Sequence, residues 1–207
     1  MEPRIAQDIA DFRKLRENGC IYVDKTEILH ELVCDPTRSL YFISRPRRFG
    51  KSLMLSTLEC IFRGERELFK GLAIDKLGYD WIEYPVLHFN FGTMDVTTFD
   101  SFNSAFVARV MRSIKAAGVV YDPAFAPGDN FANAIQKLAQ DRGNPVVILI
   151  DEYDAPVGAA LDDIEKAKAI RAKLSAFYGE IKNNAAAIRF MMMTGVTKFT
   201  QLSVFSA

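Results

Sequence analysis

The chain has 207 residues, 49% of them hydrophobic and 25% charged, which is ordinary for a soluble globular domain with a substantial core. Lysine plus arginine and aspartate plus glutamate each number 26, so the formal net charge of zero gives no support for a nucleic-acid partner. The three cysteines and two histidines show no zinc-ligand spacing, and free thiols are typical of a reducing compartment. No apolar run approaches the ~20 residues of a membrane span, so we expect a cytoplasmic protein without a membrane partner.

The N-terminal part of the chain has the pattern of a helical lead-in. A helix is expected within residues 1–20, and its apolar stripe would be Ile5, Ile9, Phe12 and Leu15. A second helix is expected after Thr26, before the turn at Asp35-Pro36. We therefore expect one domain over residues 1–207, composed of a lead-in over residues 1–38 and a core over residues 39–207.

Strand and helix patterns alternate through the core. Apolar runs predict strands near residues 40–44, 86–91, 145–151 and 188–195. Helical stripes predict a helix ending near Gly64 and further helices near residues 98–117, 129–141 and 162–183. This alternation predicts an α/β domain with a mostly parallel sheet.

The stretch from Leu40 to Leu53 has the outline of a P-loop, a phosphate-wrapping turn between a buried strand and a helix. Gly50 would let the backbone approach a phosphate, and the N–H groups and positive end of the helix would face it. Lys51 would reach the β- and γ-phosphates, and the Ser52 hydroxyl would take a Mg²⁺ coordination site. The expected nucleotide-binding residues are Arg45, Pro46, Arg47, Arg48, Phe49, Gly50, Lys51, Ser52 and Leu53.

One position departs from the full pattern G-x-x-x-x-G-K-[ST], because Arg45 stands where the first glycine belongs. The alternative interpretation is an ordinary helix N-terminus, with Gly50 for the turn and Ser52 as a cap. The flanking strand and helix favour the P-loop.

A second motif favours it further. The run from Pro145 to Ile150 predicts a strand buried on both faces, and Asp151 and Glu152 follow at its carboxyl end, where open α/β sheets bind ligands. Asp151 suits the Mg²⁺ shell, and Glu152 suits the orientation and deprotonation of an attacking water. The alternative is a pair of solvated acids, one of them capping a helix.

Four segments together resemble the bacterial AAA-ATPase-like family over essentially the whole chain: Tyr22–Thr26, Arg45–Leu53, Asp151–Asp154 and Thr194–Phe199. That family also lacks the first P-loop glycine, so Arg45 agrees with it. The resemblance implies a P-loop NTPase fold, a three-layer sandwich of the additional-strand, AAA-like type, with ATP and Mg²⁺ as cofactors. Known members commonly carry a C-terminal domain of the PD-(D/E)XK nuclease superfamily. The resemblance therefore implies that a C-terminal part, with its nuclease-like effector domain, is missing from this chain.

The resemblance also implies the strand order 5-1-4-3-2, which would place the strand of Thr194 between the P-loop strand and the Asp151 strand. Thr194 would then point toward the γ-phosphate as a catalytic sensor alongside Lys51 and Glu152, or be an ordinary strand-end threonine. Thr197 or Lys198 could do the same work.

Other residues keep two interpretations. Arg47 and Arg48 would contact phosphates or form a solvated basic edge. The segment with Tyr22, Asp24 and Lys25 would line an adenine pocket or be structural. Asp154 has the position of a turn or helix cap.

These residues predict an ATPase that drives or regulates an attached effector region. The alternative is an ATP-operated switch or scaffold with little turnover, and a homo-oligomer is compatible with either function. A small-molecule kinase is disfavoured because kinases of this fold need no glutamate at the position of Glu152. A GTPase is disfavoured because the chain has no Asn-Lys-x-Asp element.

Overall fold

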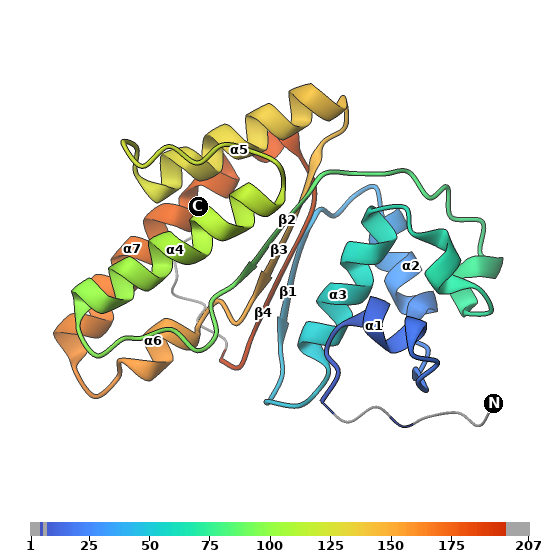
Figure 1. Cartoon of the computed structure of the whole chain (residues 1–207), viewed down its shortest axis with the longest axis horizontal. Helices are drawn as coiled ribbons and strands as arrows, with labels where there is room; N and C mark the ends of the chain where they lie inside the picture. The colour runs from blue at the N-terminus through green and yellow to red at the C-terminus, as the bar shows by residue number, and fades with distance from the viewer. Residues whose placement is uncertain (1–4, 6–7, 198–207) are drawn as a thin grey trace.

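The computed structural model describes residue 5 and residues 8–197, which form a three-layer α/β sandwich (Figure 1). The middle layer is a parallel four-stranded sheet with the order β1-β4-β3-β2. Its strands are β1 (Leu40–Ser44), β2 (Val86–Asn90), β3 (Val146–Asp151) and β4 (Ile188–Gly195). The predicted fold class is therefore confirmed, and the order agrees with four strands of the expected 5-1-4-3-2. Within the described residues the sheet has no fifth strand.

Helices cover both faces of the sheet (Figure 1). One face carries α1 (Phe12–Glu17), α2 (Thr26–Cys34) and α3 (Lys51–Phe62). The other carries α4 (Phe99–Ala116), α5 (Pro127–Arg142), the short α6 (Ala155–Ala159) and α7 (Ile164–Asn183). Short 3-10 turns complete the described elements: η1 (Arg66–Phe69), η2 (Ala73–Lys76) and η3 (Ala185–Ala187). Of the helices in this part of the chain, none is long and apolar enough to cross a bilayer.

The strand order follows from the side chains of the strands. All six residues of β3 are buried, and so is β4 from Phe190 onward, which suits two central strands covered on both faces. In the edge strand β1, Leu40 and Phe42 are each 47% exposed. The methionines Met191–Met193 lie in the core, as predicted.

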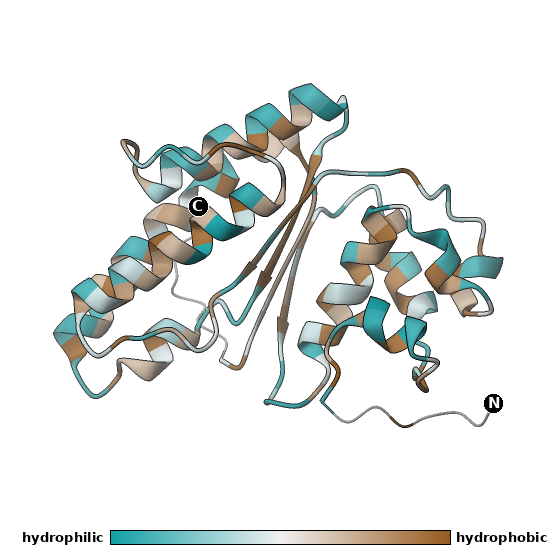
Figure 2. Cartoon of the chain, viewed as in Figure 1, coloured by the Kyte–Doolittle hydropathy of each residue, from teal (hydrophilic) through white to brown (hydrophobic). Residues whose placement is uncertain are grey.

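An aromatic cluster fills the space between the sheet and the helices α4, α5 and α7. At its centre, Phe177 of α7 stacks on Phe131 with ring centroids 4.6 Å apart. It also meets Phe89, Phe91 and Phe106 edge-on at centroid distances of 5.2–6.0 Å. Figure 2 shows the apolar residues of these helices turned toward the sheet and the polar ones turned away, which confirms the predicted stripes.

The lead-in is packed onto the same core as α3. Phe12 of α1 is fully buried and stacks on Phe69 at 4.7 Å. Asp24 accepts hydrogen bonds from the backbone N–H groups of Thr26 and Ala73, at 2.9 and 2.8 Å. The buried Thr26 hydroxyl in turn accepts a hydrogen bond from the N–H of Ile74. In this structure the contacts of Asp24 and Thr26 are therefore structural ones.

Two details differ from the sequence prediction. The first helix is shorter than expected, because the Asp11 side chain caps it by accepting from the N–H of Lys14, and Ile5 is 81% exposed. The second helix begins at Thr26 itself, with Lys25 at the cap. The short helix α6, which starts at a proline-containing turn, was not predicted.

The aromatic cluster gives a stability prediction. Phe177→Ala should lower the free energy of unfolding by about 3–5 kcal/mol, because it removes a fully packed ring and leaves a cavity. Phe125→Ala is the matched control, since that ring is 60% exposed and should change stability by less than about 0.5 kcal/mol. Urea denaturation of both variants measures the difference, and equal losses would contradict the packing described here.

Candidate functional site

The four strands run in the same direction, which brings three motifs to the carboxyl end of the sheet. The loop over residues 45–50 follows β1, Asp151 ends β3, and Thr194 lies near the end of β4. Because the strands are parallel, all of these positions lie at carboxyl ends, toward the bottom of Figure 1. This end of the sheet therefore brings the loop over residues 45–50 next to Asp151 and Thr194, which follow it in the sequence by 101 positions or more.

The loop between β1 and α3 is exposed from Arg45 to Gly50 and ends in a tight turn. Gly50 has φ +72° and Arg48 has φ +66°, and both values lie in the left-handed region. The largely buried Lys51 folds back over the loop, where its ammonium donates to the carbonyls of Arg45 and Pro46 at 2.9 and 3.0 Å. The loop thus holds a lysine ammonium at the N-terminus of a helix.

The other loop side chains are less constrained. Phe49 is 65% exposed, and Arg47 and Arg48 are exposed without a hydrogen bond or ion pair to any described residue. Leu53, in contrast, packs against the core on the α3 face of the sheet. The two arginines are thus placed to meet a phosphate or solvent.

Asp151 is the polar centre of the site. Its carboxylate is 1% exposed and accepts on both oxygens. Oδ2 accepts from the Ser52 hydroxyl at 2.5 Å, and Oδ1 accepts from the Thr194 hydroxyl and from the N–H of Glu152. A buried carboxylate needs such donors to offset its desolvation.

This arrangement has the chemistry of a Mg²⁺-nucleotide site. Mg²⁺ prefers oxygen ligands and is usually held by one or two carboxylates together with substrate phosphates and waters. The Ser52 hydroxyl and the Asp151 carboxylate supply two such oxygens side by side. Within the described residues, no group of three or more His, Cys, Asp or Glu side chains could hold a metal without other ligands. The residues present therefore fit a metal ion that arrives with a phosphate.

Thr194 was expected to point toward a phosphate. Its side chain is fully buried and donates to Asp151, so its contact in this structure is with the carboxylate. Its backbone carbonyl also accepts from the N–H of Tyr153. Thr194 is therefore placed to orient Asp151. Of the two alternative sensors, Thr197 donates its hydroxyl to Asp154, and Lys198 lies outside the described residues.

Glu152 lies directly over the loop that follows β2. Its backbone has φ +52°, a left-handed conformation that is uncommon for a residue with a side chain. Its carboxylate rests on Gly92, where an added Cβ would come within 1.8 Å of Glu152 Oε2. A glycine at position 92 is therefore required for the observed position of this carboxylate.

Asp154 and Tyr153 hold the turn after β4. Asp154 Oδ2 accepts from the N–H groups of Val196 and Thr197 at 3.0 and 2.6 Å, and from the Thr197 hydroxyl. The Tyr153 hydroxyl donates to the Thr197 carbonyl at 2.7 Å. Asp154 does occupy the cap position of α6, but its side chain makes no capping hydrogen bond. It instead links the segment after β3 to the turn after β4.

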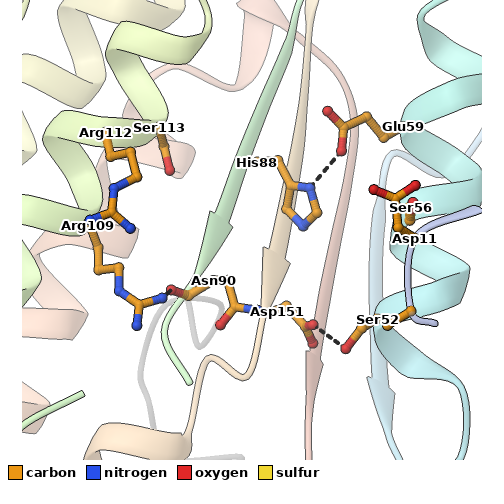
Figure 3. Close-up of a pocket in the computed structure, with 11 residues that line it drawn as sticks. Asp11, Ser52, Ser56, Glu59, His88, Asn90, Arg109, Arg112, Ser113 and Asp151 are labelled. Carbon is orange, nitrogen blue, oxygen red and sulfur yellow. Dashed lines mark hydrogen bonds and ion pairs between the residues drawn. The ribbon is translucent and has the colours of Figure 1, made fainter. Parts of the chain in front are cut away.

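A cleft of about 540 Å³, lined mainly by residues with polar or charged side chains, opens beside Ser52 and Asp151, along the free edge of β2 (Figure 3). One wall is α3 and the opposite wall is α4. Across the cleft from α4, Glu59 accepts from His88 at 2.7 Å and from Arg63 at 2.8 and 3.0 Å. Burial acts to raise the pKa of Glu59, but the hydrogen bonds and charges of His88 and Arg63 outweigh it, and the net pKa lies below its ordinary value.

Two residues that shape the site next to β2, Arg109 and Gly92, were not predicted to be functional from the sequence. Arg109 of α4 donates to the carbonyls of Asn90, Gly92 and Thr93 at 3.0, 3.1 and 3.4 Å. No motif marks Arg109, because its partners are backbone atoms of a segment that only the fold brings near. Gly92 could have been noticed as a glycine just after a predicted strand, a position that often marks a turn or a close approach of the backbone.

The bridge made by Asp154 gives a stability prediction. Asp154→Ala should lower the free energy of unfolding by about 1–3 kcal/mol, because two N–H groups and a hydroxyl lose their acceptor. Asp162→Ala is the control, since its side chain is 78% exposed and makes only a 3.8 Å ion pair. Denaturant titration compares the two, and an unchanged stability of Asp154→Ala would contradict the bridging role.

Glu59 gives a pH-dependent prediction. Because its pKa is lowered in the folded state, the ionised carboxylate stabilises the fold above its ordinary pKa of 4.5, and this contribution is lost as the pH falls through the lower folded value. Glu59→Gln should therefore cost about 1–3 kcal/mol at pH 7, and the difference from the wild type should shrink below about pH 4.5.

Unfolding curves from pH 7 to pH 3 test this. Glu67→Gln, at a side chain 78% exposed, serves as the control and should show little loss at any pH. A cost of Glu59→Gln that stays constant across the range would show that burial and packing, rather than the charge, are responsible.

Comparison with known proteins agrees with this geometry. The family model described as "Predicted AAA-ATPase" matches residues 6–205. The chain is also 37% identical over 203 residues to a curated protein of Azotobacter chroococcum mcd 1, described as an uncharacterized protein in the vnfD 5' region. That match covers 96% of this chain but 38% of the relative's length, and no solved structure gives a significant match. The chain belongs to the predicted AAA-ATPase family, which indicates an ATPase domain.

Proposed function

We propose that the chain binds ATP with Mg²⁺ in the loop over residues 45–53 and hydrolyses it. One observation carries this proposal: Lys51, Ser52, Asp151 and Glu152 lie at the same edge of the parallel sheet, and the Ser52 hydroxyl contacts an aspartate 99 positions away. A lysine, a hydroxyl and a buried carboxylate can hold phosphates and Mg²⁺, and a second carboxylate can orient and deprotonate an attacking water.

Each residue has a role that its contacts support. Lys51 would exchange the carbonyls of Arg45 and Pro46 for phosphate oxygens, which are stronger acceptors for an ammonium. Ser52 and Asp151 would hold Mg²⁺, and Thr194 would keep Asp151 in place. When bound, Mg²⁺ would neutralise charge on the phosphate oxygens. Arg47 and Arg48 are unpaired in the described structure and would add positive charge near the phosphates.

Glu152 is the proposed catalytic base. It would accept a proton from a water whose oxygen forms the new bond to the γ-phosphorus, while the bond from that phosphorus to the bridging oxygen breaks and ADP leaves. Asp151 is less suited to this task, because both of its oxygens already accept hydrogen bonds within the protein. The Glu152 side chain, half-buried on Gly92, has no hydrogen-bond donor among the described residues.

We further propose that turnover drives or regulates an attached effector region, because the chain spans 38% of its curated relative. The family resemblance suggests a nuclease-like effector. A switch that binds ATP with little turnover is the alternative, and the same experiment separates the two functions.

The test compares ATP binding and phosphate release for the wild type, Lys51→Ala and Glu152→Gln. Lys51→Ala should weaken ATP binding at least about 100-fold, because a charged phosphate contact is lost. Glu152→Gln should retain binding and lower kcat by about 10²–10⁴-fold. Lys182→Ala and Glu165→Gln, both at exposed positions, serve as charge-matched controls and should leave both quantities unchanged.

The outcomes are distinct. Tight ATP binding by Lys51→Ala would contradict the proposed site, and undiminished release by Glu152→Gln would remove Glu152 as the base. Binding by the wild type without release would favour the switch.

A further inference from the structure

We propose that Arg109 is a positioning residue for the catalytic base: it clamps the loop over residues 90–93, and that loop is the surface on which the Glu152 carboxylate rests. The inference depends on the proposed function, since it assigns Glu152 the role of base. Figure 3 shows Arg109 extending from α4 to Asn90 at the end of β2, on the opposite side of the cleft from Ser52.

Arg109 holds the loop over residues 90–93 through its guanidinium. The guanidinium of Arg109 donates to three carbonyls, those of Asn90 and Gly92 at 3.0 and 3.1 Å and that of Thr93 at 3.4 Å. No acidic side chain of the described residues pairs with it. A guanidinium has five N–H donors in a rigid fork, so a single side chain can fix several backbone groups at once. Arg109 therefore fixes the conformation of this loop through hydrogen bonds to its backbone.

The second step is the need for a clamp. β2 is an edge strand of the sheet, so the backbone groups on its outer side have no neighbouring strand. The carbonyl of Asn90 is one of these groups. The chain then leaves the sheet through Thr93, which has φ +50°. An unsupported loop in this position would lose its defined conformation, and Arg109 supplies the missing hydrogen-bond donors.

Arg109 projects from a helix that is firmly packed against the sheet. Phe106 and Val110 lie on either side of Arg109 in α4, and both are buried in the core. Helix α4 is thereby fixed to the sheet, and its arginine reaches the loop from a fixed point. The side chain of Asn90 adds a second restraint by accepting from the N–H of Gly92 at 2.9 Å.

The last step connects the loop to Glu152. A Cβ on Gly92 would come within 1.8 Å of Glu152 Oε2 and 2.7 Å of its Cδ, so this backbone is in direct contact with the carboxylate. The N–H of Phe91 also donates to the carbonyl of Asp151, the residue just before Glu152. A displacement of the loop would therefore displace the base, and a shift of about 1 Å in a reacting group can cost about 10²-fold in rate.

The experiment uses the full chain with Arg109→Ala, Arg109→Lys and the control Lys115→Ala, which removes an exposed cation from the same helix. We expect Arg109→Ala to lower kcat about 10–100-fold while the dissociation constant of a slowly hydrolysed ATP analogue changes less than about 3-fold. Arg109→Lys should recover part of the rate, because an ammonium can still donate to some of the carbonyls. Lys115→Ala should match the wild type.

Two further arms make the test specific to Glu152. In the Glu152→Gln background, Arg109→Ala should cause no additional loss, because the group that it positions is already absent. Hydrogen exchange of residues 91–94 in the nucleotide-free protein should become faster in Arg109→Ala, and this readout does not depend on activity. Gly92→Ala reaches the same contact without altering Arg109, and should also lower kcat with ATP-analogue binding retained.

The inference is overturned by an unchanged kcat of Arg109→Ala, by unchanged exchange over residues 91–94, or by equal losses in the Glu152 and Glu152→Gln backgrounds. Failure of the proposed function has a different signature, a wild-type rate that does not depend on Glu152. In that case the positioning role falls with it.

Discussion

The site depends on one buried carboxylate. Asp151 ends the central strand β3 and is almost entirely shielded from solvent, and its carboxylate contacts Ser52 in the first turn of α3 and Thr194 near the end of β4. Three donors make this position tolerable: the hydroxyls of Ser52 and Thr194 and the N–H of Glu152. Each donor comes from a different motif or from the adjacent residue, so the carboxylate fixes their relative positions. Removing any of them would leave the buried carboxylate with an unsatisfied acceptor, so the three motifs are structurally interdependent.

The strand order makes this convergence necessary. With β4 between β1 and β3, the end of β4 is enclosed by the loop after β1 and the segment after β3. Gly195 has no room for a side chain there, since an added Cβ would lie 2.4 Å from Tyr153 and 2.6 Å from Asp154. The carbonyl of Gly195 also accepts a hydrogen bond from the N–H of Arg45, at the start of the loop over residues 45–50. The glycine thus lets three chain segments meet at van der Waals distance.

Local patterns in the sequence were sufficient for the strands, the buried stripes of α4, α5 and α7, and the loop over residues 45–50 between a strand and a helix. They were sufficient because a strand buried on both faces gives a continuous apolar run, and a helix buried on one face gives an apolar stripe with a period of 3.6 residues. They failed at the first helix, where a single capping aspartate at position 11 overrode an apolar stripe that began at Ile5. They also missed Arg109 and Gly92, whose partners are 16 to 19 positions away for the arginine and 60 positions away for the glycine. Such contacts have no sequence period, so only the folded chain shows them.

The two carboxylates of the site are supported by different layers of the sandwich. Asp151 is tied to α3 through Ser52, whereas the carboxylate of Glu152 rests on a loop that Arg109 ties to α4. Helices α3 and α4 lie on opposite faces of the sheet and face one another only across the cleft at the edge of β2. A displacement of α4 would therefore reach the proposed base through the loop over residues 90–93, whereas Lys51 is held by the carbonyls of Arg45 and Pro46 in the loop after β1. Under the proposed function, the lysine that would bind ATP and the carboxylate that would act as the base are therefore held by different loops, and Asp151 contacts both layers, through Ser52 and through the N–H of Phe91.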